Sequence, residues 1–162
     1  MESASFTHFD EYGNAIMADI SNKSITARQA VAAGKITMSK ECYEAVKGGT
    51  VKKGDVLGTA RLAGIMGAKQ TSSLLPLCHI LSIEQASIDF TLNDDEHTIT
   101  AECCIKVTDK TGAEMEALTG VSIALLTVYD MCKSIDKSMT ISDICLLKKH
   151  GGKSGEYKRG TK

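Results

Sequence analysis

An acidic and a basic side chain stand together at the end of the longest apolar stretch of the chain. Asp130 and Lys133 close the segment KTGAEMEALTGVSIALLTVYDMCK, residues 110–133, which carries charge only at its two ends. Side chains three residues apart are neighbours on a helix, so this carboxylate and this ammonium can pair. Two interpretations remain open: a weak ion pair where the helix reaches solvent, or an acid/base pair whose pKa values are tuned by partial burial.

The other end of the same stretch carries two carboxylates, Glu114 and Glu116, on either side of Met115. Thr111 and Glu114 have the spacing of a capping box, in which the carboxylate would satisfy a backbone amide at the start of a helix. Glu116 has no capping role. The pair could also accept hydrogen bonds from the N–H groups of a heterocyclic ligand, and both roles can hold together.

A histidine and a cysteine stand side by side in TSSLLPLCHIL, residues 71–81, which also holds the only proline. We expect this segment to be a buried turn that enters a strand. Among leucines, His79 is either a core residue with its hydrogen bonds satisfied or a candidate catalyst, with Cys78 beside it.

Four cations could line an anion pocket around a second helix, predicted after Asp55 as its N-cap in VLGTARLAGIMGAKQ. The alternative for each of them is solvated surface charge; they are Lys52, Lys53, Arg61 and Lys69. Glycine costs about 1 kcal/mol relative to alanine inside a helix, so the glycines of this segment predict a tight contact of the helix with the sheet or with another subunit.

The C-terminal segment HGGKSGEYKRGTK is basic and rich in glycine. Gly152-Lys153-Ser154 fails the phosphate-loop pattern, because Leu147 stands where that pattern requires glycine and no apolar helix follows Ser154. Such a segment could still fold over a phosphate of its own or of another subunit.

Composition narrows the functional classes. A chain of 162 residues with a net charge of −1 predicts one domain and no dedicated nucleic-acid binder, since it lacks a basic excess. Six cysteines, mostly within apolar runs and without a CxxC pair, predict reduced, buried thiols and no structural metal. We expect a cytoplasmic protein because no signal peptide is visible, and no membrane span because the apolar run is shorter than the roughly 20 residues needed.

Hydrophobic periodicity predicts the fold class. Strand signals lie within residues 25–38, 86–92, 99–107 and 139–147, with a weaker edge strand at 14–21, and helices are expected after Ser39, after Asp55 and over the apolar stretch. The order β-α-β-β-α-β predicts an α+β, ferredoxin-like (split βαβ) antiparallel sheet with helices on one face and N-terminal additions. We expect a lead at 1–13, one domain at 14–147 and a basic tail at 148–162. The second sheet face is expected to meet another element or subunit, which predicts a homo-oligomer.

Three segments together resemble the cyclic pyranopterin monophosphate synthase family of molybdenum cofactor biosynthesis. They are KKGDVLGTARLAGIMGAKQTSSLLPLCHIL, KTGAEMEALTGVSIALLTVYDMCK and HGGKSGEY, and the likeness extends from about Asn14 to Tyr157. One departure is Ile80, where the family often has proline.

The resemblance implies conversion of 3′,8-cyclo-7,8-dihydroguanosine 5′-triphosphate into cyclic pyranopterin monophosphate with release of pyrophosphate, without a metal or organic cofactor. It implies Asp130 as the catalytic acid or base, with Lys53 and Lys133 as its cationic partners. It also implies a hexamer of three dimers with sites at the dimer interface. The substrate-site residues that it implies are Leu77, Cys78, His79, Met115, Glu116, Glu114 and Lys69.

Lys53 lies far along the chain from Asp130, so we expect these two groups to converge from different subunits. Two other functions remain open on the residues alone: a non-catalytic nucleotide sensor, which would need Arg61, Lys69 and Glu116 but not the Asp130–Lys133 pair, and a purely structural oligomer. Pyrophosphate release from the cyclic dihydro-GTP substrate would separate them from the enzyme.

Overall fold

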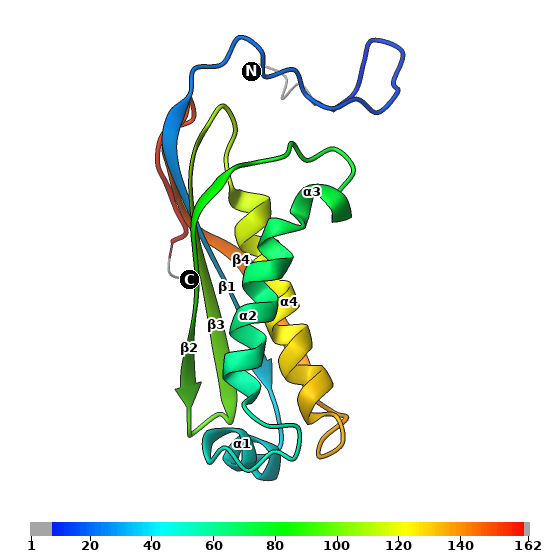
Figure 1. Ribbon diagram of the computed structural model, residues 1–162, viewed down its shortest axis with the longest axis vertical. Coiled ribbons are helices and arrows are strands. Elements are labelled where there is room, and N and C mark those ends of the chain that lie inside the picture. The colour runs from blue at the N-terminus through cyan, green and yellow to red at the C-terminus, as the bar shows by residue number, and fades with distance from the viewer. Residues whose placement is uncertain (1–7, 161–162) are drawn as a thin grey trace.

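The computed structural model describes residues 8–160 and contains one five-stranded sheet with helices packed on one of its faces (Figure 1). In chain order the elements are β1 (Thr26–Thr37), α1 (Lys40–Lys47), α2 (Val56–Lys69), α3 (Thr71–Leu74), β2 (Ile83–Asn93), β3 (Thr98–Asp109), α4 (Glu114–Cys132), β4 (Thr140–His150) and β5 (Tyr157–Lys158).

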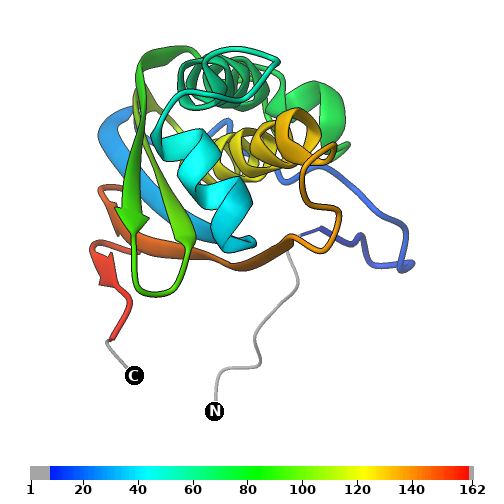
Figure 2. The ribbon, with the colours of Figure 1, turned by 90° about the horizontal axis from the view of Figure 1, so that it is seen from below.

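The strands lie in the order β2-β3-β1-β4-β5, and every pair of neighbours is antiparallel. This is the predicted α+β, ferredoxin-like arrangement, seen end-on in Figure 2 with the helices gathered on one side of the sheet. The expected edge strand at 14–21 is wrong: only an isolated bridge joins Phe9 to Ala15 there. The tail predicted from residue 148 begins inside β4, and its two-residue β5 extends the sheet.

Side-chain hydrogen bonds cap the starts of α1 and α2, whereas α3 and α4 begin without one. Ser39 accepts a hydrogen bond from the Cys42 amide and Asp55 accepts one from Gly58, so both predicted N-caps are confirmed. The capping box at α4 is wrong, because Ala113 occupies the N-cap and no side chain caps the helix. The Glu114 carboxylate instead lies 3.0 Å from the Lys149 ammonium on β4.

Glycines of α2 allow close packing on two sides. A Cβ added at Gly64 would collide with Ile88 of β2, which confirms the predicted contact with the sheet, and the same glycines also bring α2 close to α4, a helix contact that the sequence did not predict. A Cβ added at Gly64 would lie 2.8 Å from the Gly120 carbonyl oxygen on α4, and one added at Gly67 would lie 2.6 Å from Ile123. Backbones at this distance leave no room for a larger side chain. The two helices therefore form one closely packed layer over the sheet.

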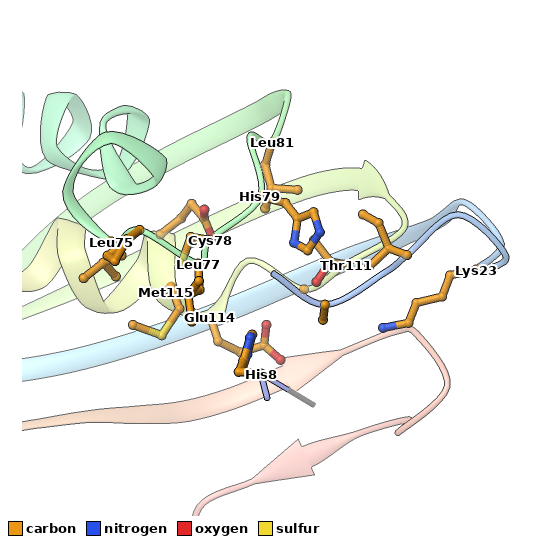
Figure 3. A pocket seen from close by; sticks show the side chains of 15 residues that line it. His8, Lys23, Leu75, Leu77, Cys78, His79, Leu81, Thr111, Glu114 and Met115 are labelled. Carbon is orange, nitrogen blue, oxygen red and sulfur yellow. The ribbon is translucent and has the colours of Figure 1, made fainter. Parts of the chain in front are cut away.

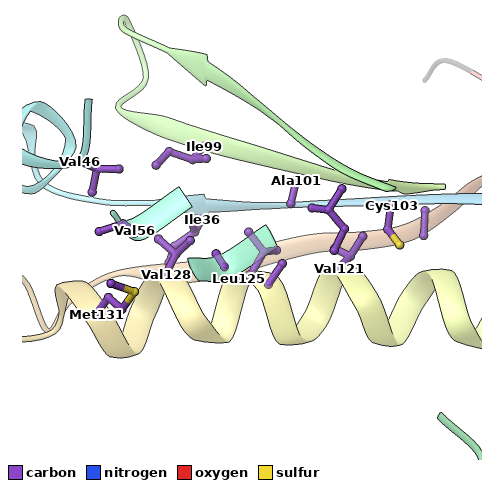
Figure 4. Packing of buried hydrophobic residues seen from close by; sticks show 14 of the residues in the cluster. Ile36, Val46, Val56, Ile99, Ala101, Cys103, Val121, Leu125, Val128 and Met131 are labelled. Carbon is purple, nitrogen blue, oxygen red and sulfur yellow. The ribbon is translucent and has the colours of Figure 1, made fainter. Parts of the chain in front are cut away.

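The core lies between this layer and the sheet (Figure 4). Val121, Leu125 and Val128 of α4 are fully buried and face the alternating apolar residues of β3, among them Ile99 and Cys103. With 19 largely apolar residues, α4 does meet the length and composition of a membrane span, so the length argument against a span is wrong. Half of its most apolar stretch is buried inside the protein, and this burial identifies α4 as the core helix of the fold.

The segment predicted as a buried turn is more open than expected. After α3 it runs as an irregular loop to β2, in which Cys78 and His79 are half-buried and Ile80 is 87% exposed. All six cysteines are free thiols, but the prediction that they are buried holds for only three of them: Cys42, Cys103 and Cys132 are buried, whereas Cys78, Cys104 and Cys145 are half-buried.

Candidate functional site

Asp130 lies between two ammonium groups at the C-terminal end of α4. Its Oδ1 is 2.7 Å from Lys133 Nζ, and its Oδ2 is 3.3 Å from Lys53 Nζ, which also donates to the Asp130 carbonyl oxygen at 2.8 Å. The hydrogen bonds from Lys133 and then Lys53 lower the pKa of Asp130, and Asp130 in turn raises the pKa of Lys133. The carboxylate is therefore held ionised between two cations.

Lys53 reaches Asp130 within one chain, from the turn that precedes α2. The expectation that these two groups come from different subunits is therefore wrong: α2 runs antiparallel to α4, which returns the start of α2 to the end of α4 (Figure 1). All three side chains remain between 45% and 61% exposed. Exposed ion pairs contribute little to stability, and these three groups stay accessible to a ligand or a partner subunit.

A cavity of about 500 Å³ opens at the opposite, N-terminal end of α4 (Figure 3). Leu77, Cys78 and His79 line it from the loop after α3, and residues 114–116 line it from the first turn of α4. His8, Ala18, Ile20 and Lys23 close it from the N-terminal segment. The sequence-predicted substrate residues of two distant segments thus meet at one cavity.

Glu116 is the most buried carboxylate of this cavity, with 4% of its surface exposed. Burial raises its pKa to about 7, and the nearby Glu114 carboxylate adds to the effect. Burial also raises the pKa of the Cys78 thiol, with a smaller contribution from Glu116. Near neutral pH, Glu116 can therefore exist in both protonation states, so it can accept or donate a hydrogen bond.

A second cavity of about 960 Å³ shares Lys23, Thr111, Gly112 and Glu114 with the first. It is strongly cationic: Glu114 is its only acidic lining residue, against Lys23, Arg28, Lys110, Lys149 and Lys153. The Thr26 hydroxyl lies buried in its wall without a hydrogen-bond partner. We call this space the cationic cavity; its charge and polar lining suit a polyanion.

Arg28 is held rigidly in the cationic cavity. Its Nε donates to the Asp109 carbonyl oxygen at 2.9 Å, and its Nη2 donates to that of Lys110 at 3.0 Å. Gly151 and Gly152 pass close beside it with left-handed backbone, φ 92° and 77°, where added Cβ atoms would collide with Ala27 and Arg28. The glycine-rich segment therefore packs against the strand that carries Arg28.

Not all predicted cations gather at these sites. Arg61 donates to the Ile88 carbonyl oxygen and pairs with Asp89 at 3.2 Å, so it stabilises the contact between α2 and β2. Lys69 is exposed at the end of α2 and lines neither cavity. The anion pocket expected around α2 is therefore not assembled within one chain.

Four cations of the cationic cavity were not predicted from the sequence: Lys23, Arg28, Lys110 and Lys149. Their only signal is a basic residue near the end of a strand or in the turn beside it. The pairing of β1 with β3 and β4 brings them together, because Thr26 pairs with Asp109 and Ala30 with Lys149. Within residues 8–160, no group of three or more His, Cys, Asp or Glu side chains could hold a metal ion.

Asp130, Lys53 and Lys133 form one group, which we call the Asp130 cluster. This cluster and the two cavities lie at opposite ends of α4. From Glu114 to Asp130 the axis of α4 extends about 24 Å, at a rise of about 1.5 Å per residue. Within a single chain, this length of helix separates the Asp130 side of the molecule from the cavities.

Residues 17–152 match the MoaC family model. The chain is 56% identical over 151 residues to a cyclic pyranopterin monophosphate synthase of Clostridium perfringens, covering 93% of this chain and 96% of that protein. It is 54% identical to the protein of the same name from Pelobacter propionicus, covering 95% and 96%, and 55% identical to that from Heliobacterium modesticaldum, covering 94% and 96%.

The burial of Glu116 predicts a pH-dependent stability difference. Because its pKa is raised from 4.5 to about 7 in the folded protein, its stabilising contribution is fully present below about pH 4.5 and is lost as the pH rises through 7. Glu116→Gln removes the titrating group, so the variant does not lose stability over this pH range as the wild type does. We expect the variant to gain on the order of 1–3 kcal/mol relative to the wild type between pH 5 and pH 8.

Urea unfolding of both proteins at a series of pH values, at equal protein concentration, measures this difference. Glu102→Gln, which removes an exposed carboxylate from β3, serves as the control. A stability difference between Glu116→Gln and wild type that stays constant from pH 5 to pH 8 would contradict the account of Glu116.

Proposed function

The chain belongs to the MoaC family, and we propose that it converts 3′,8-cyclo-7,8-dihydroguanosine 5′-triphosphate into cyclic pyranopterin monophosphate with release of pyrophosphate, a lyase step of molybdenum cofactor biosynthesis. The observation that carries this proposal is the 56% identity, over 93% of the chain, to a cyclic pyranopterin monophosphate synthase. The geometry supports it because the two joined cavities offer separate places for a heterocycle and for a polyphosphate.

The purine-derived ring occupies the cavity of residues 77–79 and 114–116 in this proposal. Glu116 and Glu114 receive ring N–H groups, Leu77 and Met115 contact the ring faces, and Cys78 and His79 close the site. The triphosphate extends into the cationic cavity, where Arg28 presents a fixed guanidinium and Lys23, Lys110, Lys149 and Lys153 supply further positive charge.

Asp130, Lys53 and Lys133 provide the chemistry in this proposal. A cyclic phosphate forms when a hydroxyl oxygen of the substrate attacks the α-phosphorus and the bond to the β-phosphate oxygen breaks, so that pyrophosphate leaves. The attacking hydroxyl must lose a proton, and Asp130, held ionised by its two lysines, can accept it. Lys53 and Lys133 then neutralise the negative charge that develops on the phosphate oxygens.

A complete site needs two subunits, because about 24 Å of helix separates these groups from the cavities within one chain. Leu62 and Met66 on α2 and Leu126 on α4 are more than half exposed, which favours a second copy docked on the helix layer. A two-fold axis across α4 would bring the Asp130 end of one subunit to the cavity of the other.

We propose that such dimers assemble into a hexamer, with Lys69 of α2 contributing to the shared site. Six free thiols favour a reducing compartment and support a cytoplasmic location.

Turnover of the proposed substrate tests the function directly. Purified protein incubated with the cyclic dihydro-GTP is expected to release pyrophosphate, and Asp130→Asn is expected to abolish release while retaining fold and substrate binding.

Lys53→Ala and Lys133→Ala should each lower the rate about 10²–10³-fold, because each removes one preorganised charge. Absence of pyrophosphate from the wild-type reaction would refute the function. A loss of rate below about tenfold in either lysine variant would show that this lysine has no catalytic role.

Mixed oligomers test whether the site is shared. Asp130→Asn and His79→Ala chains, each inactive alone, are expected to regain about a quarter of wild-type activity after co-refolding at equal amounts, because half of the dimers are mixed and each has one intact site. The matched control is Asp130→Asn with Lys53→Ala. These two residues contact each other within one chain, so every mixed site carries one defect and stays inactive. Equal recovery in both mixtures, or none with His79→Ala in mixed oligomers verified by native mass spectrometry, would contradict the shared site.

A further inference from the structure

The ion pair between Glu114 and Lys149 lies where the two cavities join. Glu114 lines both cavities, and its Oε1 is 3.0 Å from Lys149 Nζ on β4. Lys149 Nζ also contacts the Ser154 hydroxyl of the glycine-rich segment at 2.6 Å. A single ammonium thus connects the start of α4 to the wall of the cationic cavity.

This pair is more buried than every other ion pair among residues 8–160. Its side chains are 23% and 27% exposed, whereas those of the other pairs are between 39% and 80% exposed. Charges that are partly removed from water interact more strongly than surface charges, so a carboxylate at this position affects any anion nearby.

Glu114 carries a negative charge in a cavity that is otherwise lined by positive charges. The other charged residues that line the cationic cavity are five cations, and Glu114 is the one acidic residue among the four that line both cavities. Phosphate oxygens beside it would be repelled, and they would also need the ammonium that Glu114 engages. The structure therefore places an internal anion in direct competition with the phosphates of a ligand.

We propose that Lys149 exchanges between Glu114 and the phosphates of the ligand, so that Glu114 is an internal competitor that weakens pyrophosphate binding and promotes its release. The inference rests on the proposed function, which makes pyrophosphate a product. When the bond to the α-phosphate has broken, pyrophosphate is held only by the cations of the cavity. Glu114 then regains Lys149 and lowers the affinity for the departing product.

Titration calorimetry with inorganic pyrophosphate tests this exchange without any turnover. Glu114→Gln keeps the shape of the side chain and removes its charge, so we expect it to bind pyrophosphate about five- to tenfold more tightly than the wild type. The control is Glu156→Gln, which removes an exposed carboxylate from the glycine-rich segment after β4, at a residue that does not line the cationic cavity. This variant is expected to bind pyrophosphate as the wild type does.

A double-mutant cycle identifies Lys149 as the group exchanged. In a Lys149→Gln background, Glu114→Gln is expected to change pyrophosphate affinity much less than in the wild type. Unchanged or weaker binding by a Glu114→Gln protein with a wild-type circular dichroism spectrum would overturn the proposal, as would an undiminished effect without Lys149. Failure of the proposed function would show separately, as absence of turnover.

Discussion

The close packing of α4 against both α2 beside it and the sheet beneath it is the constraint on which the site depends. Gly64 and Gly67 allow α2 to approach α4, and the apolar face of α4 is buried along its length against β1 and β3. A helix packed in this way cannot shift or bend without opening the core. Its length therefore fixes the distance between the chemistry at Asp130 and the cavity at Glu116.

The surroundings at the two ends of α4 shift the pKa of a carboxyl group in opposite directions. At Asp130, which is exposed to solvent, two ammonium groups keep the carboxylate ionised. At Glu116, burial favours the protonated form of the carboxyl group. Carboxyl groups whose pKa values are moved apart by their surroundings can divide acid and base roles between them. In this account one suits proton abstraction near the phosphate, and the other suits recognition of a heterocycle that carries both donors and acceptors.

Patterns local in sequence predicted most of the elements, whereas the errors at the candidate site came from contacts distant in sequence. The apolar face of α4, the alternation of β3 and the caps at Ser39 and Asp55 are all read within a few residues. The α4 capping box failed because Lys149 competes for Glu114 from a strand 35 residues later. Arg28 and Lys149 were missed for the same reason, since only strand pairing makes them neighbours.

The central claim is that each catalytic site combines the cavities of one subunit with the Asp130 cluster of another. A crystal structure of the assembled Asp130→Asn protein with bound 3′,8-cyclo-7,8-dihydroguanosine 5′-triphosphate measures this directly. The account predicts that the α-phosphate lies within hydrogen-bonding distance of Lys53 and Lys133 of the partner subunit, and about 20 Å or more from those of the chain that binds the ring. A ligand that contacts the ring cavity and the lysines of one and the same chain would contradict it.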